Sequence, residues 1–203
     1  LAAARKAGRI GIVPHVSHVP VNTFWDIGKR DGTAIWLHQK IGAEHRFIGY
    51  IEGHGENYDY YVAELERTGF LWGTHHLPHD AAHERQGATS TFKPLGELEK
   101  LRPHWRFTIV ERVPDIVHGI NLTRAIFNQC WFDEPTCALG LQRLGNYRKE
   151  RDERLGVFKA TPRHDENSEG ADAFRQFAQG WSEPAVQAGA RPKRPRGRGA
   201  MAA

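Results

Sequence analysis

The strongest constraint on the fold is a pair of alternating apolar runs separated by a turn signal. In residues 23–27 the side chains alternate between the two faces of a strand, which places Asp26 on the same face as Phe24. Asp31-Gly32 is a hairpin signal, and residues 33–38 have the pattern of the returning strand. The sequence therefore predicts a β-hairpin that carries one carboxylate among large apolar side chains.

That carboxylate needs an explanation, because burying an unpaired charge is costly. One possible partner for Asp26 is a divalent cation. The other interpretation is structural: an aspartate at the end of a strand often caps the turn that follows. The hairpin alone favours the structural interpretation, because most acids at strand ends are structural.

Composition limits the class of protein. The chain has 203 residues, 39% hydrophobic and 26% charged, which is typical of one globular domain with polar extensions. No apolar run is long enough to span a membrane, and the N-terminus has no signal-peptide pattern. Cys130 and Cys137 are too few for a disulfide framework, so we expect a reduced setting and two core cysteines. Leu1 in place of methionine is consistent with a piece of a longer protein.

Positive charge is concentrated at the two ends. Residues 1–9 carry three basic groups and residues 191–203 carry five, with no acid in either segment. The rest of the chain has 20 Lys and Arg against 24 Asp and Glu. Any nucleic-acid surface on the folded part must therefore be a local patch.

The same distribution suggests three regions. We expect residues 1–20 to be a linker or lead-in, residues 21–180 to form one domain, and residues 181–203 to be a disordered basic tail. The basic groups of the tail could add sequence-independent attraction to phosphates, or could simply keep the tail soluble. They are Arg191, Lys193, Arg194, Arg196 and Arg198.

Further strands and helices follow the hairpin. Strands are expected at residues 46–52, 72–77 and 106–110, and helices at residues 58–68, 95–101, 115–127, 134–144 and 169–179. A helix between two strands usually makes a parallel crossover, so the strand at 72–77 should lie beside the first strand. This arrangement would bring Asp80 close to Asp26.

Asp172 on the last helix completes a set of three aspartates, and the local sequences around them resemble a known family. The matching segments are Trp25-Asp26-Ile27-Gly28, Leu77-Pro78-His79-Asp80-Ala81, Cys130-Trp131-Phe132-Asp133, His164-Asp165 and Ala171-Asp172-Ala173-Phe174-Arg175. Their order resembles the C-terminal nuclease domain of the large terminase subunit of tailed bacteriophages, over roughly residues 20–180. The resemblance implies an α/β, ribonuclease H-like fold. It would have a mixed central sheet of about five main strands, helices on both faces and an auxiliary charged hairpin.

The resemblance also implies a chemistry. Two divalent cations, Mg²⁺ or Mn²⁺, would be held by carboxylates, with Asp26 shared between both ions and Asp80 and Asp172 each completing one site. Asp165 is a weaker candidate for a metal ligand or a neighbour of one, and its alternative is a loop acid that caps the last helix. Glu52, at the end of the strand at 46–52, is also a possible ligand, although we expect it to be solvated.

Basic residues before the last helix are the predicted DNA contact. In the related nucleases a β-hairpin occupies this place, whereas the residues alone would equally fit a solvated charged face. The candidates are Arg148, Lys149, Arg151, Arg154, Lys159 and Arg163.

Four histidines could suggest zinc, but the pattern disfavours it. His75 and His76 are adjacent and would point to opposite faces of a strand, and no cysteine accompanies them. His79 and His83 complete the group.

The functional expectation is a metal-dependent endonuclease domain that cuts concatemeric double-stranded DNA during phage packaging. The resemblance implies that its partners would be the terminase ATPase domain, the small terminase subunit and the portal, in the cytoplasm of a bacterial host. The chain has no Gly-x-x-x-x-Gly-Lys-Ser/Thr motif, so the resemblance covers only the nuclease half. Alternatives are another ribonuclease H-like nuclease, of the resolvase or integrase type, and a non-catalytic DNA-binding or docking module.

Overall fold

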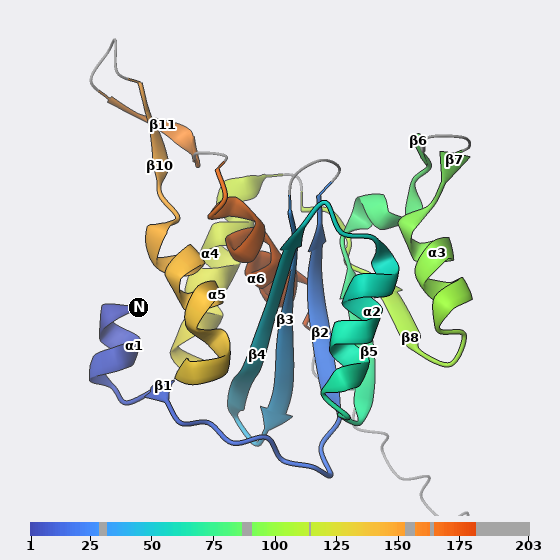
Figure 1. Cartoon of the computed structure of the whole chain (residues 1–203). Coiled ribbons are helices and arrows are strands. Elements are labelled where there is room, and N and C mark those ends of the chain that lie inside the picture. The colour runs from blue at the N-terminus through green and yellow to red at the C-terminus, as the bar shows by residue number, and fades with distance from the viewer. Residues whose placement is uncertain (29–31, 87–90, 114, 153–156, 163–164, 182–203) are drawn as a thin grey trace, which may run out of the picture.

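The computed structural model describes residues 1–28, 32–86, 91–113, 115–152, 157–162 and 165–181, without the side chains of residues 149–161. A seven-stranded mixed sheet forms the centre of the molecule (Figure 1), in the order β1-β9-β4-β3-β2-β5-β8. Its strands are β1 (Ile10–Gly11), β2 (Val21–Ile27), β3 (Gly32–Ile41), β4 (Glu44–His54), β5 (Trp72–Leu77), β8 (Arg106–Ile109) and β9 (Cys130–Asp133).

The predicted hairpin and crossover are both present. Strands β2, β3 and β4 form an antiparallel meander, and β5 runs parallel to β2 with Phe24 opposite His76. The crossover helix α2 (Tyr58–Arg67) begins where Asn57 accepts a hydrogen bond from the Tyr60 amide at 3.0 Å. Just after its end, Gly69 adopts a positive φ of 66°, which side chains other than glycine rarely adopt.

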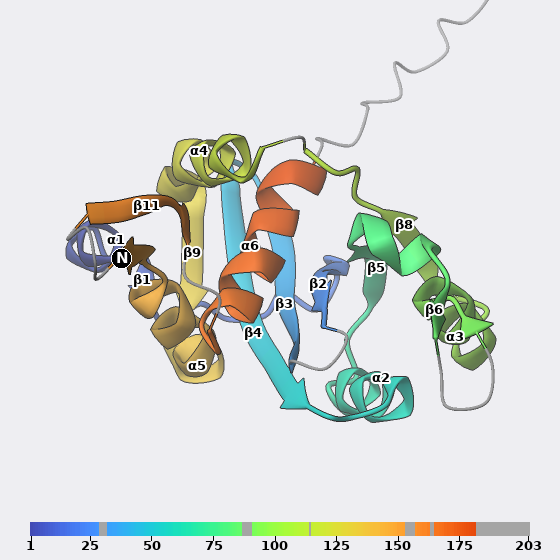
Figure 2. The ribbon, with the colours of Figure 1, turned by 90° about the horizontal axis from the view of Figure 1, so that it is seen from above.

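Helices cover both faces of the sheet, as Figures 1 and 2 show. One face packs against α4 (Ile116–Ile126), α5 (Glu134–Asn146) and α6 (Ser168–Gly180), and the other against α2 and α3 (Pro94–Leu101). The remaining elements are α1 (Ala2–Lys6), the short 3-10 helices η1 (His79–Ala82) and η2 (Phe127–Gln129), the small pair β6 (Arg85–Gln86) and β7 (Thr91–Phe92), and the pair β10 (Lys149–Asp152) and β11 (Val157–Pro162).

Each face has its own hydrophobic core, which follows from the alternation of β2. The α6 face is mainly aromatic, with Phe24, Trp36, Phe47, Phe132, Phe174 and Phe177 buried together. The opposite face is centred on Trp25, Ile35, Tyr61, Leu65, Leu77 and Leu98. Cys130 and Cys137 are buried in the α6-side core, as predicted, and burial raises the pKa of each thiol to about 12.

The sheet has two strands more than the sequence suggested. The segment expected to be a lead-in contains α1 and β1, and β1 pairs in parallel with β9. Strand β9 in turn pairs with β4, with Phe47 opposite Phe132. The expected tail beyond Trp181 lies outside the described residues. None of the helices in the described ranges is long and apolar enough to cross a membrane.

Candidate active site

Asp26 lies near the C-terminal end of β2, on the face covered by α6. Alternation places it on the same face as Phe24, which is fully buried under α6. Its partner on β3 is Ala34, so only a methyl group stands beside the carboxylate in the neighbouring strand. Asp26 is therefore partly buried but not crowded by its neighbouring strand.

The electrostatic surroundings of Asp26 are strongly acidic. Burial raises the pKa of Asp26 well above its usual range, and the carboxylates of Asp172, Glu169 and Asp80 raise it further. Arg175 acts in the opposite direction. The three aspartates chosen from the sequence are thus electrostatic neighbours, joined by a glutamate that the sequence analysis did not select.

Asp80 reaches this place because β5 runs parallel to β2, so that both strands end at the same edge of the sheet. It lies in η1, directly after β5. Arg85 Nη2 donates to Asp80 Oδ2 at 2.8 Å and to the Ile27 carbonyl at 3.2 Å. The Arg85 side chain is 8% exposed, so this ion pair ties η1 to the end of β2 in a largely dry environment.

Helix α6 supplies the third carboxylate, Asp172, and with it Glu169. The two residues are three positions apart, which puts them on one side of the helix. Asp172 forms an ion pair with Arg175, with Oδ1 and Nη1 2.9 Å apart. Glu169 is buried, and its Oε2 atom has no hydrogen-bond partner in the part of the chain that the structure describes. The i, i+3 spacing from Asp172 is the signal by which the sequence could have identified Glu169.

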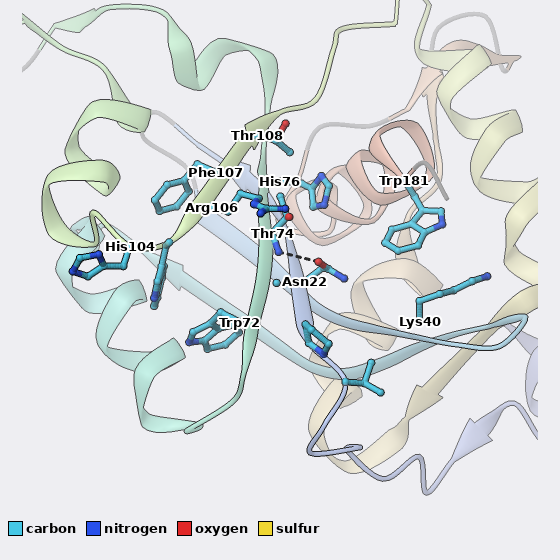
Figure 3. A pocket seen from close by; sticks show the side chains of 14 residues that line it. Asn22, Lys40, Trp72, Thr74, His76, His104, Arg106, Phe107, Thr108 and Trp181 are labelled. Atoms are coloured by element: carbon cyan, nitrogen blue, oxygen red, sulfur yellow. Dashed lines mark hydrogen bonds between the residues drawn. The ribbon is translucent and has the colours of Figure 1, made fainter. Parts of the chain in front are cut away.

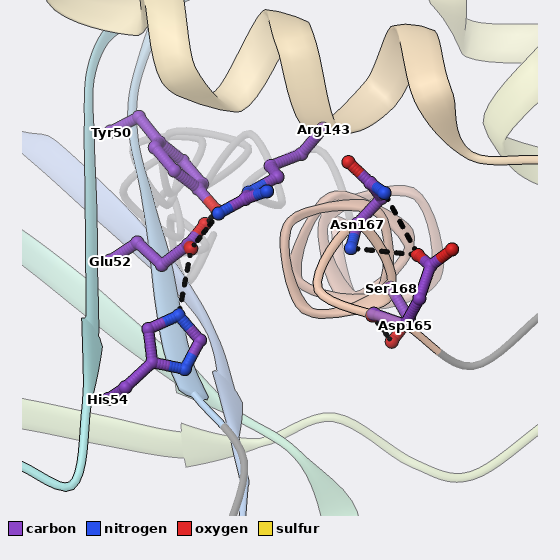
Figure 4. A network of polar contacts seen from close by, with 7 residues as sticks. All are labelled: Tyr50, Glu52, His54, Arg143, Asp165, Asn167 and Ser168. Atoms are coloured by element: carbon purple, nitrogen blue, oxygen red, sulfur yellow. Dashed lines mark hydrogen bonds and ion pairs between the residues drawn. The ribbon is translucent and has the colours of Figure 1, made fainter.

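Asp165 stands just before α6 and makes the contacts of a helix start. Its Oδ1 atom accepts from the backbone amide and the side-chain amide of Asn167, both at 3.0 Å. Its carbonyl accepts from Ser168 N at 2.8 Å (Figure 4). These contacts order the turn that precedes α6, whose N-cap residue is Asn167, and both roles expected for Asp165 stay predictions.

The prediction for Glu52 was wrong. Its side chain is 2% exposed rather than solvated, because Arg143 pairs with both of its oxygens at 2.7 and 3.1 Å (Figure 4). Tyr50 donates to the same carboxylate at 2.5 Å. Although burial alone would raise the pKa of Glu52, the hydrogen bonds from Arg143 and Tyr50 lower it.

The histidines of β5 point to opposite faces, as predicted. His75 is hydrogen-bonded to the Thr23 hydroxyl at 2.8 Å, whereas His76 stacks on Phe24 with ring centroids 4.4 Å apart. Burial lowers the pKa of His75 to about 3 and that of His76 to about 4, so both rings are neutral at pH 7.

The predicted DNA-contacting segment forms an antiparallel pair, β10 with β11. In Figure 1 this pair projects beyond the edge of the sheet at which β2 ends. Arg148 is exposed. The side chains of Lys149, Arg151, Arg154, Lys159 and Arg163 lie outside the described part, so the structure does not test their predicted role.

Metal ions were part of the prediction, and the donor set fits them chemically. Carboxylate oxygens are the ligands that Mg²⁺ and Mn²⁺ prefer, and the oxygen of Glu169 lacks a protein partner among the described residues. In the described ranges, however, no group of three or more His, Cys, Asp or Glu is arranged so that it could hold a metal ion. Instead, arginines neutralise two of the carboxylates, Asp80 and Asp172.

Comparison with known proteins gives a structural match but no sequence match. No protein-family model matches the chain, and no curated protein matches it in sequence. The nuclease domain of the large terminase of bacteriophage SPP1, with bound Mn, is 14% identical, with a TM-score of 0.55 over 85% of this chain and 97% of that domain. The P22 large terminase nuclease domain is 16% identical, with a TM-score of 0.55 over 83% of this chain and 84% of that domain.

The fold is that of a large terminase nuclease domain. The large terminase of a thermophilic bacteriophage shows how much of a longer chain this corresponds to. It matches 83% of this chain with a TM-score of 0.59 at 13% identity, but only 41% of its own length is covered. The ribonuclease H-like architecture expected from the sequence is thereby confirmed. At these identities the likeness concerns the fold.

Proposed function

We propose that this chain is the metal-dependent endonuclease domain of a phage DNA-packaging terminase, cutting concatemeric double-stranded DNA. The observation that supports the proposal is that Asp172, Glu169 and Asp80 all act electrostatically on Asp26, in a fold like that of terminase nuclease domains. A parallel strand pair and one helix bring together carboxylates that are up to 146 positions apart in the sequence. Burial, and after it repulsion from these carboxylates, raises the pKa of Asp26, and a bound cation would relieve both effects.

Each residue has a role in this proposal. Asp26 would be shared between two divalent ions, with Asp80 and Asp172 each completing one site and Glu169 as an additional donor. The SPP1 domain with bound Mn and the phage G20c nuclease with bound magnesium support this choice of ion. When bound, such ions stabilise charge on a phosphodiester and lower the pKa of a water.

The arginines have a second role in this account. Arg85 and Arg175 form ion pairs with Asp80 and Asp172. These ion pairs reduce the repulsion between the neighbouring carboxylates in the folded protein. A cleft of about 370 Å³ lies beside Asp80, and Arg175 also lines it. It offers a DNA phosphate a way to approach, and the β10–β11 pair extends from the same edge of the sheet.

As partners we propose double-stranded DNA and, from the likeness to whole terminases, a packaging ATPase domain, a small terminase subunit and a portal. The host cytoplasm is the corresponding place of action. The chain carries no phosphate-binding ATPase motif of its own.

A plasmid-cleavage assay tests the proposal. The wild type and Asp26→Ala are each incubated with supercoiled plasmid in EDTA, Mg²⁺ or Mn²⁺. We expect cutting that requires metal and falls at least about a hundredfold in the variant, because metal stabilisation of the transition state is worth several kcal/mol. Asp59→Ala is the matched control, since Asp59 is exposed on α2 at the opposite face. DNA binding without cutting in any metal would support the docking module instead. Equal cutting by the wild type and Asp26→Ala would mean that the site is elsewhere.

A four-way junction distinguishes the rival nuclease. A resolvase-type enzyme would cut the junction in preference to plain duplex, whereas the packaging nuclease is expected to cut both without preference.

A further inference from the structure

A large cavity lies at the other end of the sheet from the aspartates. It has a volume of about 860 Å³ and opens between the beginnings of β2 and β5, the edge strand β8 and Trp181 at the end of α6 (Figure 3). We call it the lower cleft. Its lining includes Asn22, Lys40, Trp72, Thr74, His76, Trp105, Arg106 and Trp181.

Charge in the lower cleft has one sign. Lys40 and Arg106 are its permanent cations, and no aspartate or glutamate is among the described residues that line it. Arg106 is exposed on the edge strand, and Lys40 Nζ lies 3.2 Å from His45 Nε2. The cleft is therefore suited to an anion.

Hydrogen-bonding groups in the lower cleft are not fully used. Trp181 Nε1 and His76 Nδ1 are both shielded from solvent, and neither has a hydrogen-bond partner in the described part of the chain. The Asn22 side chain accepts from Thr74 N at 2.9 Å, and this contact turns its amide nitrogen toward the cleft (Figure 3). An acceptor-rich ligand would satisfy these groups, which cost free energy when left unpaired.

The position of Asn22 depends on a glycine. A Cβ atom at Gly73 would clash with Asn22 Oδ1. Only glycine lets the carboxamide lie against β5 in this way, so the sequence of β5 is matched to the polar wall of the cleft.

Aromatic rings form the remaining walls. Trp72 and Trp105 contact each other with ring centroids 5.6 Å apart and pack on the α2–α3 side of the sheet, where Trp105 also stacks on His75 at 4.3 Å. Trp181 instead packs on the α6 side, where Lys40 and Asn22 are labelled beside it in Figure 3. Indole rings beside cationic side chains provide stacking surfaces for bases together with charge for phosphates. An acidic peptide would match the charge but would make no particular use of the flat indole faces.

We propose that the lower cleft binds a nucleotide unit, with its phosphate against Lys40 and Arg106 and its base against the indole ring of Trp181. The unit is either a free nucleotide or part of a DNA strand. Helix α6 connects the two places: Asp172 and Trp181 are separated by about 14 Å along its axis. A strand bound against Trp181 would lie on the same face of the sheet as the candidate active site. The proposal does not depend on the nuclease activity.

Isothermal titration calorimetry of the full chain tests this nucleotide-binding proposal, and EDTA is included so that no cleavage can occur. The probes are ATP, dTMP, inorganic phosphate and a short oligothymidylate, added to the wild type and to Arg106→Gln combined with Lys40→Gln. We expect the double variant to weaken nucleotide binding at least about tenfold, because each lost contact is a charge-assisted hydrogen bond. Arg67→Gln is the matched control, since Arg67 is 70% exposed on α2. Tryptophan fluorescence gives a second readout of occupancy.

The probes that bind show whether the ligand is a free nucleotide or part of a DNA strand. Binding of ATP or dTMP supports a free nucleotide, and binding of the oligothymidylate alone supports a DNA strand. Equal affinity of the wild type and the double variant for every probe, or binding of inorganic phosphate as tight as that of nucleotides, would overturn the proposal. Thermal unfolding of the double variant verifies that it is folded, and plasmid cutting is scored separately.

Discussion

Replacing Arg143 by methionine is expected to destabilise the protein markedly, and the reason is the burial of Glu52. Two hydrogen bonds from Arg143 neutralise this carboxylate, whose side chain is 2% exposed while that of Arg143 is 15% exposed. Methionine keeps the aliphatic packing but removes the charge. Glu52 would then be a buried anion that retains only Tyr50 and His54 as partners among the described residues.

The magnitude follows from this geometry. Removing one partner of a buried ion pair costs about 3–5 kcal/mol. The contacts of Glu52 to Tyr50 and His54 remain in the variant, so we take the lower end, about 3 kcal/mol. For a domain of this size, that corresponds to a fall in Tm of about 6–12 °C. Arg67→Met removes an exposed i, i+3 pair with Glu64 and should cost no more than about 0.5 kcal/mol.

Urea unfolding of the wild type and the two variants at pH 7 measures these costs, and repeating it at low pH tests their cause. The folded-state pKa of Glu52 is lowered, so its stabilising contribution is present above the unfolded pKa, about 4.3, and is lost as pH falls through the folded value. The gap between the wild type and Arg143→Met should therefore narrow between about pH 5 and pH 3. A difference in the free energy of unfolding below about 1 kcal/mol between the wild type and Arg143→Met at pH 7, or a difference that persists at low pH, would refute the reasoning.

The same variant should also affect the candidate active site. Gly170, between Glu169 and Asp172 on α6, lies so close to this network that a Cβ atom there would meet Tyr50 Oη at 2.7 Å and Arg143 Cβ at 2.8 Å. The network therefore supports the beginning of the helix that carries two of the acids.

Three other perturbations follow from the structure. Asp26→Asn should raise Tm in EDTA at pH 7 and leave it unchanged near pH 3. Because the folded-state pKa of Asp26 is raised, the wild type loses stability as pH rises above about 3.9, and the amide avoids this loss. Equal Tm values of the wild type and the variant at pH 7 would contradict this prediction. Arg85→Met frees the carboxylate of Asp80, so the rise in Tm on adding Mn²⁺ should be larger than in the wild type, and a smaller rise would mean that Arg85 helps to form the site. Gly140→Ala places a Cβ atom 2.5 Å from the Trp36 ring and should cost about 1–3 kcal/mol in urea unfolding, whereas an unchanged midpoint would show that the ring can move.

Much of the fold could be predicted from the sequence, because its signals are local. Alternation and a turn signal marked β2 and β3, and a capped amphipathic helix before β5 implied the parallel crossover that places Asp80 near Asp26. Strands β1 and β9 were not predicted because they are short and are stabilised by pairing with strands far away in the sequence. Ile10 of β1, for example, lies opposite Phe132 of β9.

In the candidate site, too, some residues could be selected from the sequence, whereas others are evident only in the folded chain. Asp26 and Asp80 were selected from their places at strand ends, and Asp172 from the resemblance to the terminase nuclease family. Glu52 looked solvated in the sequence because its partner Arg143 is 91 residues away. Glu169 and Arg85 were missed for a similar reason, since only the folded chain shows that one is buried and the other reaches the end of β2.

The most direct test of the central claim is the anomalous scattering of Mn²⁺ in crystals of the full chain grown with the ion. Our account predicts manganese within about 2.0–2.3 Å of an Asp26 carboxylate oxygen, with Asp80, Asp172 or Glu169 among the other ligands, and a shift of at least one arginine away from its aspartate. Manganese bound only at other places, in protein that cuts DNA, would contradict the account.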